Sequence, residues 1–323
     1  MRAGLVIGAG VAAAVAGAAV ATKSAQGRAH RIQTAADPYP YDVLRRDPVG
    51  EERVVERPDG TRIRVVVAGD GPTVVLAHGF AVAMVEWNLV WDDLLARGYR
   101  VVAFDQRGHG QSTIGEDGIG SLPMAGDYLA VFEQLGIDTA VLVGHSMGGF
   151  LAITAMLDVP GFAQRVSGLV LFATFSGDIT RDAPQNKVQI PLLRSGLLQK
   201  AVTNDTVGTL FGASLMGETP SPAMVRVFLE TFRAQDHVAL LPILVAFAEE
   251  DRADRLGEIA VPTIVICGRM DKTTPPWQSE RLAAAIPGAR MSWVEGAGHM
   301  VNWEAPESLV AAVEELSPVA RPG

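Results

Sequence analysis

Short apolar runs alternate with helix-like segments along most of the chain, and this alternation constrains the fold more than any other feature. The runs are TVVLAH (73–78), YRVVAFD (99–105), TAVLVG (139–144), GLVLFAT (168–174) and TIVICG (263–268). They are nearly continuous in apolar residues, as strands buried on both faces are. Strands that alternate with helices predict an α/β protein whose mainly parallel sheet is covered by helices on both faces.

Two further runs, TRIRVVVA (61–68) and ARMSWVE (289–295), lie before and after this series. The first run ends in the turn sequence GDGP (69–72), which predicts a hairpin with the strand that follows. The chain has 323 residues, of which 48% are hydrophobic, and this is ample for one large core.

The alternation stops between Ser176 and Gly257. Pieces of this stretch, such as PLLRSGLLQKAV and MVRVFLETF, carry apolar faces at helical spacing. The stretch is too long for a loop. We therefore predict a helical cap at 176–257, between a first core segment at 51–175 and a second at 258–318. A helical subdomain that does not contact the substrate is the alternative.

Residues 1–22 form a hydrophobic N-terminal segment. Residues 3–22 carry no charge and are long enough to span a bilayer as a helix. Arg2 before them and an Ala-Val-Ala sequence near their end are equally typical of a cleaved secretory signal. The segment predicts a membrane-anchored or secreted protein rather than a cytoplasmic one. Residues 23–50, which are polar and contain proline, are interpreted as a linker to the folded domain.

The composition excludes some partners. The chain has 27 Lys and Arg against 36 Asp and Glu, a formal net charge of −9. An acidic protein is not expected to bind nucleic acid, which requires a basic face.

Cys267 is the only cysteine, so no intramolecular disulfide can form. No cluster of ligating residues indicates a metal, and we expect no cofactor. The oligomeric state is left open.

GHSMGG (144–149) stands where the strand-like run TAVLVG meets a helix-like stretch. Gly144 and Gly148 would let the backbone take a strained turn and let strand and helix approach closely. In this context the motif predicts that Ser146 is a nucleophile at the C-terminal end of a strand. The dipole of the following helix would favour the negative charge that develops there. A turn that is tight only for packing is the alternative.

A serine nucleophile needs a base and an acid that orients the base. Asp271 follows the run TIVICG, and His299 follows ARMSWVE on a glycine-rich loop. Both are expected at the C-terminal ends of strands, where active sites gather in such sheets. We predict that His299 is the base and that Asp271 fixes its tautomer. Asp178, just after GLVLFAT, is a rival acid, and His145 is expected only to shape the turn beside Ser146.

An oxyanion hole completes the predicted site. The main-chain amides of Met147, which follows the nucleophile, and of Phe80, in the HGF loop after TVVLAH, are the expected donors. His78 is expected to hydrogen-bond this loop rather than to act as a base. The residues after Phe80 are apolar and the cap is rich in Leu, Phe and Met, which predicts an apolar substrate pocket.

Five motifs together resemble the successive signatures of the α/β-hydrolase family, in its esterase/lipase-like branch: HGF, DQRGHGQS, GHSMGG, GRMDKTTP and GAGHMVNWEAPE. They cover the chain from about residue 50 to 316. The resemblance implies a mostly parallel eight-stranded sheet flanked by helices, a helical cap inserted after the sixth strand and a Ser–Asp–His triad. Epoxide hydrolases and haloalkane dehalogenases of this fold carry aspartate where this chain has Ser146, so those activities are not expected.

The sequence thus predicts a serine hydrolase that cleaves small carboxylic esters with an apolar acyl or alkyl group through an acyl-enzyme intermediate. A cofactor-free haloperoxidase-like perhydrolase, a lactonase and a C–C bond hydrolase would use the same triad and are alternatives. Haloperoxidase-like members commonly carry Phe, and C–C bond hydrolases typically carry Asn, at the position of His145, so this neighbour does not decide between them. A non-catalytic, hydrolase-like ligand receptor is a further alternative.

Overall fold

The computed structural model describes residues 21–179, 181 and 184–317. Its strands form one eight-stranded sheet with the order β1-β2-β4-β3-β5-β6-β7-β8. The strands are β1 (Glu51–Glu56), β2 (Arg62–Ala68), β3 (Thr73–Ala77), β4 (Arg100–Phe104), β5 (Ala140–His145), β6 (Val166–Phe172), β7 (Thr263–Gly268) and β8 (Arg290–Val294). All neighbouring pairs from β4 to β8 are parallel, whereas β2 runs antiparallel to both β1 and β4.

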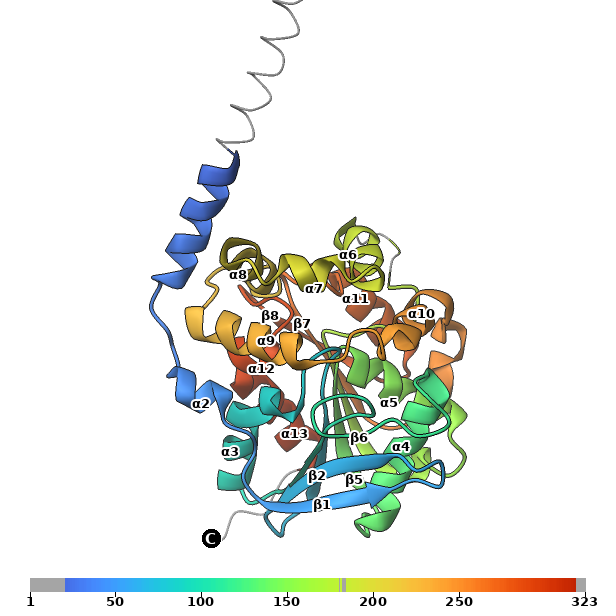
Figure 1. Ribbon diagram of the computed structural model, residues 1–323. Helices are drawn as coiled ribbons and strands as arrows, with labels where there is room; N and C mark the ends of the chain where they lie inside the picture. Colours follow the sequence, from blue (N-terminus) through green and yellow to red (C-terminus); the bar gives the residue numbers. More distant parts are fainter. Residues whose placement is uncertain (1–20, 180, 182–183, 318–323) are drawn as a thin grey trace, which may run out of the picture.

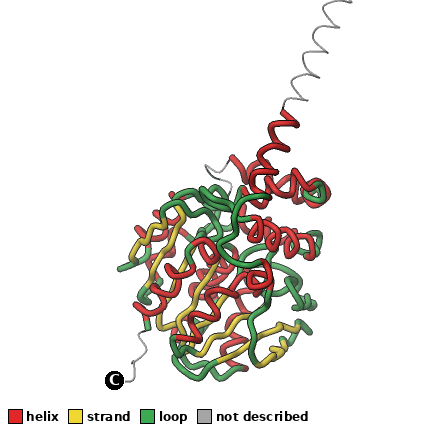
Figure 2. The backbone as a smooth tube through the Cα atoms, turned by 90° about the vertical axis from the view of Figure 1, so that its left-hand side faces the viewer, coloured by secondary structure: helices red, strands yellow, loops and turns green. Residues whose placement is uncertain are grey.

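Helices cover both faces of this sheet (Figures 1 and 2). The α-helices are α2 (Tyr41–Arg45), α3 (Asn88–Ala96), α4 (Ser121–Gln134), α5 (Met147–Asp158), α6 (Pro184–Arg194), α7 (Leu197–Ala201), α8 (Asp205–Ala213), α9 (Pro222–Ala234), α10 (Leu241–Glu249), α11 (Pro276–Ala285), α12 (Val301–Glu304) and α13 (Pro306–Leu316). Short 3₁₀ helices are η1 (Met84–Trp87), η2 (Ala163–Arg165) and η3 (Ala253–Glu258).

Alternate residues of the central strands enter separate cores on the two faces of the sheet. In β3, Val75 and Ala77 join the cluster that includes α4 and α5, while Val74 and Leu76 join the cluster that includes α3 and α13. Because both faces are covered, the strands read as continuous apolar runs. The predicted α/β architecture, a mostly parallel eight-stranded sheet flanked by helices, is confirmed.

The hairpin predicted at GDGP is wrong, because β4 lies between β2 and β3. Gly69 and Gly71 of this turn lie against the segment that leads into β4. A Cβ at these positions would come within 2.1 Å of the carbonyl oxygen of Tyr99 and 1.8 Å of that of Gly98. The turn glycines therefore carry the chain closely past the start of β4 instead of folding β3 back onto β2.

β1 was not among the strands expected from apolar runs. Its sequence is EERVVE, and Val55 is its only buried residue. It lies at the edge of the sheet beside β2, and an edge strand of this kind lacks the buried pattern on which the prediction relied.

Helices α6 to α10 follow β6 and precede β7, where the cap was expected. In Figure 1, α6, α7 and α8 lie at the opposite end of the body from β1 and β2. Phe228 and Phe232 of α9 pack with Met300 and Trp303 in a third apolar cluster. This cluster joins the cap to the segment that follows β8.

Residues 23–50, interpreted from the sequence as a linker, contain regular structure that packs against the cap. Residues 21–33 are helical, and Ile32 is buried with Leu44 of α2 in the third cluster. Gln33 Nε2 donates a hydrogen bond of 2.9 Å to Thr209 Oγ1 of α8.

Within residues 21–179, 181 and 184–317, no helix has the length and hydropathy needed to cross a bilayer. The anchor or signal predicted at 1–22 falls almost wholly outside these ranges and stays a prediction.

Candidate active site

Ser146 connects β5 to α5 through a strained turn. Its φ of 49° and ψ of −113° are values that residues other than glycine rarely adopt. The Ser146 N–H donates to the carbonyl oxygen of Phe172 (3.1 Å), and Thr174 Oγ1 donates to the Ser146 carbonyl oxygen (2.6 Å). A Cβ at Gly148 would lie 2.1 Å from the carbonyl oxygen of Ala77 in β3. The neighbouring strands therefore hold the turn, and only glycine at 148 allows this close approach.

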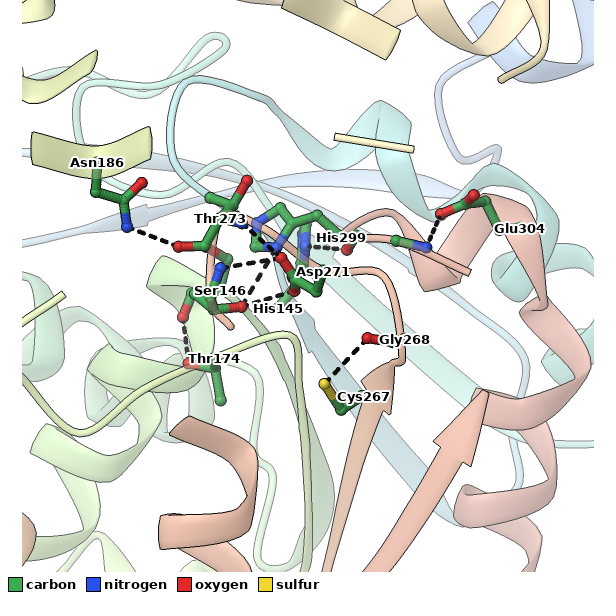
Figure 3. Close-up of polar contacts among 12 residues, drawn as sticks. His145, Ser146, Thr174, Asn186, Cys267, Gly268, Asp271, Thr273, His299 and Glu304 are labelled. Carbon is green, nitrogen blue, oxygen red and sulfur yellow. Dashed lines mark hydrogen bonds and ion pairs between the residues drawn. The ribbon is translucent and has the colours of Figure 1, made fainter. Parts of the chain in front are cut away.

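Asp271 and His299 come from the loops after β7 and β8, as predicted, and lie beside each other near Ser146 (Figure 3). His299 Nδ1 and Asp271 Oδ2 are 2.8 Å apart. Asp271 Oδ1 also accepts the N–H groups of Thr273 (2.8 Å) and Thr274 (2.9 Å), and Oδ2 accepts the Thr274 hydroxyl (2.8 Å). The structure thus surrounds one buried carboxyl with several donors.

These contacts fix the direction of the hydrogen bond between Asp271 and His299. Burial raises the pKa of Asp271, but His299 and the donors from Thr274 outweigh it, and the net pKa lies below its ordinary value. Asp271 is therefore a carboxylate, which can only accept hydrogen bonds. It follows that His299 Nδ1 carries the proton of this hydrogen bond. In the neutral imidazole, His299 Nε2 then has the lone pair that a general base requires.

The rival acid Asp178 lies on the segment after β6. It is partly exposed, its φ is 43°, and its carbonyl oxygen faces Gln278 Nε2 at 3.4 Å. The hydrogen bond of His299 Nδ1 goes to Asp271 instead. The structure therefore favours Asp271 as the orienting acid.

Met147 and Phe80, the expected oxyanion donors, both lie near Ser146. Met147 is the first residue of α5, so its N–H has no acceptor within the helix. Phe80 follows β3, and its side chain lines the same cavity as Ser146. The two residues come from the elbow and from the β3 loop, the segments that supply the oxyanion donors in a site of this kind, and their role as donors stays a prediction.

His78 hydrogen-bonds this loop, as expected from the sequence. Its Nε2 accepts the Gln106 N–H at 2.8 Å, so its Nδ1 carries the proton and donates to the carbonyl oxygen of Gly79 at 2.7 Å. Both ring nitrogens are engaged in a fully buried site, which removes His78 as a base.

Ser146 and His299 line one cavity beneath the cap, of about 90 Å³. Apolar side chains form most of its wall: Phe80, Val82, Ile179, Ile190, Leu193, Phe211, Leu215, Phe228, Phe232, Leu244, Phe247 and Met300. Asn186 and Thr273 add polar atoms, and no Lys or Arg is among the described residues of the wall.

A larger hollow of about 460 Å³ lies between helix 21–33 and α9 and contains none of the five predicted site residues. Within the part of the chain that the structure covers, no three His, Cys, Asp or Glu side chains are placed to hold a metal ion.

The sequence did not single out Glu86, although it lies next to the predicted site. Glu86 belongs to η1 and is fully buried. His145 Nδ1 lies 3.0 Å from Glu86 Oε2, and His145 Nε2 lies 3.2 Å from the carbonyl oxygen of His299. Both nitrogens of His145 are therefore occupied, and its ring also stacks on Phe172. A lone acid in the apolar stretch FAVAMVEW was the available signal for Glu86.

The cap is tied to the loops that carry the acid and the base. Asn186 of α6 donates from Nδ2 to the carbonyl oxygen of Thr273 at 2.7 Å (Figure 3). Glu304 of α12 accepts the N–H of Gly217 in the cap (2.6 Å) and that of Gly298 beside the base (2.8 Å). These contacts link the cap directly to the loops of the acid and the base, while most of the residues with which the cap lines the cavity are apolar.

Comparison with known proteins places this geometry in context. A family model described as "alpha/beta hydrolase fold" matches residues 72–306. A Klebsiella pneumoniae protein named 2-hydroxy-6-oxononadienedioate/2-hydroxy-6-oxononatrienedioate hydrolase is 30% identical, over 76% of this chain and 88% of its own length. A non-heme haloperoxidase from Rhodococcus erythropolis is 30% identical, over 75% of this chain and 90% of its own. An esterase from Exiguobacterium antarcticum superposes with a TM-score of 0.73 at 25% identity, covering 83% of this chain and 98% of that one.

Proposed function

The chain belongs to the α/β-hydrolase family and is a hydrolase, and on that premise we propose that it cleaves carboxylic esters with an apolar acyl or alkyl group. The observation that carries the proposal is the apolar cavity that Ser146 and His299 share. A pocket of this kind accepts uncharged, apolar groups because it offers them burial without leaving polar groups unpaired.

In the first half of the reaction, Ser146 Oγ attacks the ester carbonyl carbon while His299 Nε2 takes its proton. Asp271 accepts the hydrogen bond from Nδ1 and stabilises the imidazolium that forms. The N–H groups of Met147 and Phe80 donate to the oxyanion of the tetrahedral intermediate. The bond to the alcohol oxygen then breaks, and His299 returns its proton to the leaving alkoxide.

In the second half, a water molecule attacks the acyl-enzyme on Ser146. His299 takes a proton from this water, the tetrahedral intermediate forms again in the same oxyanion hole, and the acid leaves as Ser146 Oγ regains its proton. The reaction consumes one ester and one water and yields one alcohol and one acid. It requires no group beyond those named.

The charge of the cavity wall separates this proposal from the activity named for the Klebsiella relative, whose substrate is a dioate and carries two carboxylates. Burying a carboxylate in an apolar cavity without a cation is strongly unfavourable. The described wall contributes no Lys or Arg. This favours an uncharged ester over a dicarboxylate.

The test is hydrolysis of p-nitrophenyl esters from acetate to laurate, with Ser146→Ala as the control for background cleavage. We expect turnover by the wild type and none above background by the variant.

A matched pair of substrates, p-nitrophenyl butyrate and the p-nitrophenyl monoester of succinate, tests the preference for uncharged groups. The neutral ester should be favoured by about tenfold or more in kcat/KM, because the anion loses hydration in the cavity. Absence of ester hydrolysis at every chain length would contradict the proposal.

A further inference from the structure

A second pair of one histidine and one carboxyl group lies next to Ser146, and the mechanism above does not use it. Glu86 is 0% exposed and His145 is 2% exposed. His145 Nδ1 lies 3.0 Å from Glu86 Oε2 and 3.1 Å from Oε1. Because both groups are buried, the position of their shared proton decides whether the protein interior holds two charges or none.

The hydrogen-bond partners of the pair fix the direction of each bond. The carbonyl oxygen of His299 can only accept, so His145 Nε2, 3.2 Å away, must carry a hydrogen. In a neutral imidazole the other nitrogen, Nδ1, then accepts. The donor facing it is the carboxyl O–H of Glu86. Glu86 Oε1 remains free to accept the Gly79 N–H at 3.1 Å.

Burial favours this uncharged form. Transfer of the proton from Glu86 to His145 would create a carboxylate and an imidazolium in a buried site, where the desolvation penalty is large. Burial raises the pKa of Glu86 well above its ordinary value and lowers the pKa of His145 well below its own. Both directions oppose the transfer.

The pair contacts the three chain segments that the proposed reaction needs. Glu86 holds Gly79, the residue before the oxyanion donor Phe80. His145 directly precedes Ser146 and holds the main chain of the base His299. A Cβ at Gly79 would lie 2.8 Å from His145 Nδ1, so the loop and the imidazole are in close contact.

We propose that Glu86 and His145 form an uncharged hydrogen-bonded pair that positions the oxyanion loop and the base loop next to Ser146. This inference rests on the proposed function. Glu86 and His145 are positioning residues, because they act through the main chain of their neighbours and do not touch the reacting atoms. Asn302, the second residue of α12, also holds η1 in place. Its Nδ2 donates a hydrogen bond of 2.7 Å to the carbonyl oxygen of Glu86.

Two variants of similar size separate hydrogen bonding from space filling. In Glu86→Gln, the amide oxygen can accept from Gly79 and the amide nitrogen can donate to His145 Nδ1, as the neutral carboxyl does. In Glu86→Met, both partners lose their bond. We expect kcat of Glu86→Gln to stay within about threefold of the wild type and kcat of Glu86→Met to fall about tenfold or more. The latter is a smaller effect than the 10²–10³-fold that follows loss of a whole oxyanion donor.

KM should change less than kcat in Glu86→Met, because the cavity wall is intact. Equal kcat in Glu86→Met and the wild type would overturn the positioning role. If kcat fell as far in Glu86→Gln as in Glu86→Met, the uncharged state of Glu86 would be overturned, because the activity would then require a carboxylate at this position. Thermal unfolding of each variant shows whether it is folded at the assay temperature.

A measurement on the wild type does not depend on turnover. ¹⁵N NMR of the histidine rings, with His145 assigned by its loss in His145→Phe, should give one protonated and one unprotonated nitrogen for His145 across pH 6 to 8. Two protonated nitrogens would contradict the proposal. If the wild type hydrolyses no ester, the proposed function fails, but this spectrum still tests the pair.

Discussion

The two buried histidine–carboxyl pairs of this hydrolase have similar geometry and opposite electrostatics. The Nδ1 to carboxyl distance is 2.8 Å for His299 and Asp271 and 3.0 Å for His145 and Glu86. Nevertheless the pKa of Asp271 is lowered, whereas burial raises that of Glu86. The residue types and the distance therefore do not determine which pair carries charge.

The difference lies in the remaining hydrogen bonds of each carboxyl group. Asp271 accepts two N–H groups and one hydroxyl from Thr273 and Thr274 in addition to its histidine. Glu86 accepts one N–H, from Gly79. Several donors stabilise a buried carboxylate, and one donor is too few to offset desolvation. A charged pair can stabilise the imidazolium that forms in the reaction, while an uncharged pair can hold loops in place without changing its own protonation.

The largest expected effect is that of Asp271→Asn, which removes the charge from the first pair. The amide would let His299 adopt the wrong tautomer and would not stabilise its cation, so we expect kcat to fall about 10³–10⁴-fold. Hydrolysis of p-nitrophenyl butyrate measures this loss. Asp178→Asn should retain most activity; the reverse pattern, with activity lost in Asp178→Asn and kept in Asp271→Asn, would show that the acid has been misassigned.

A smaller loss is expected when the second pair is broken by His145→Phe. Phenylalanine can keep the stacking on Phe172 but has no nitrogen to meet Glu86 or the His299 carbonyl. We expect kcat to fall about tenfold, which corresponds to about 1.4 kcal/mol. The double variant with Glu86→Met should lose little more than either single variant, because both remove the same interaction. Additive losses would indicate that the two residues act separately.

Thr274→Val tests the donors that keep Asp271 charged. The change removes the hydroxyl that donates to Asp271 Oδ2 at 2.8 Å and keeps the main-chain N–H. A hydrogen bond of this kind contributes about 0.5–1.5 kcal/mol, so kcat should fall about 2- to 10-fold. Thr274→Ser, which retains the hydroxyl, is the matched control and should restore most of the activity. A valine variant as active as the serine variant would show that this donor is not needed.

Glu304 lies between Asp271 and Glu86 in the number of hydrogen bonds that its carboxyl group accepts. Its protonation should change the free energy of unfolding of the protein. It accepts two N–H groups, and burial raises its pKa to about 7. The folded protein therefore binds a proton more tightly than the unfolded chain, whose Glu pKa is near 4.3. The stability that this proton contributes is fully present below about pH 4.3 and is lost as pH rises through about 7.

Glu304→Gln measures this contribution, because Gln stays uncharged. From pH 5 to pH 8, the free energy of unfolding of the wild type should decrease relative to that of Glu304→Gln, as measured by urea unfolding. Glu307→Gln, at an exposed position on α13, is the control. A difference between wild type and Glu304→Gln that does not change with pH would contradict the raised pKa.

The sequence predicted the elements that local pattern defines. The central strands read as apolar runs because both faces of the sheet are covered. The serine turn was recognisable because its close backbone contacts require glycine. The predictions that failed or were missed depend on distant contacts. The order of β2, β4 and β3 results from packing across the sheet, and β1 has one buried residue and hence almost no pattern.

By itself, the sequence determined the α/β-hydrolase fold and the order in which Ser146, Asp271 and His299 occur at the ends of strands. Only the tertiary structure decided which acid meets the base, and that Glu86 meets His145 across 59 positions of the chain. It also decided which carboxyl group is charged. The physical reason is that a strand is specified by its own residues, whereas the protonation of a buried carboxyl group depends on donors that the fold brings from elsewhere.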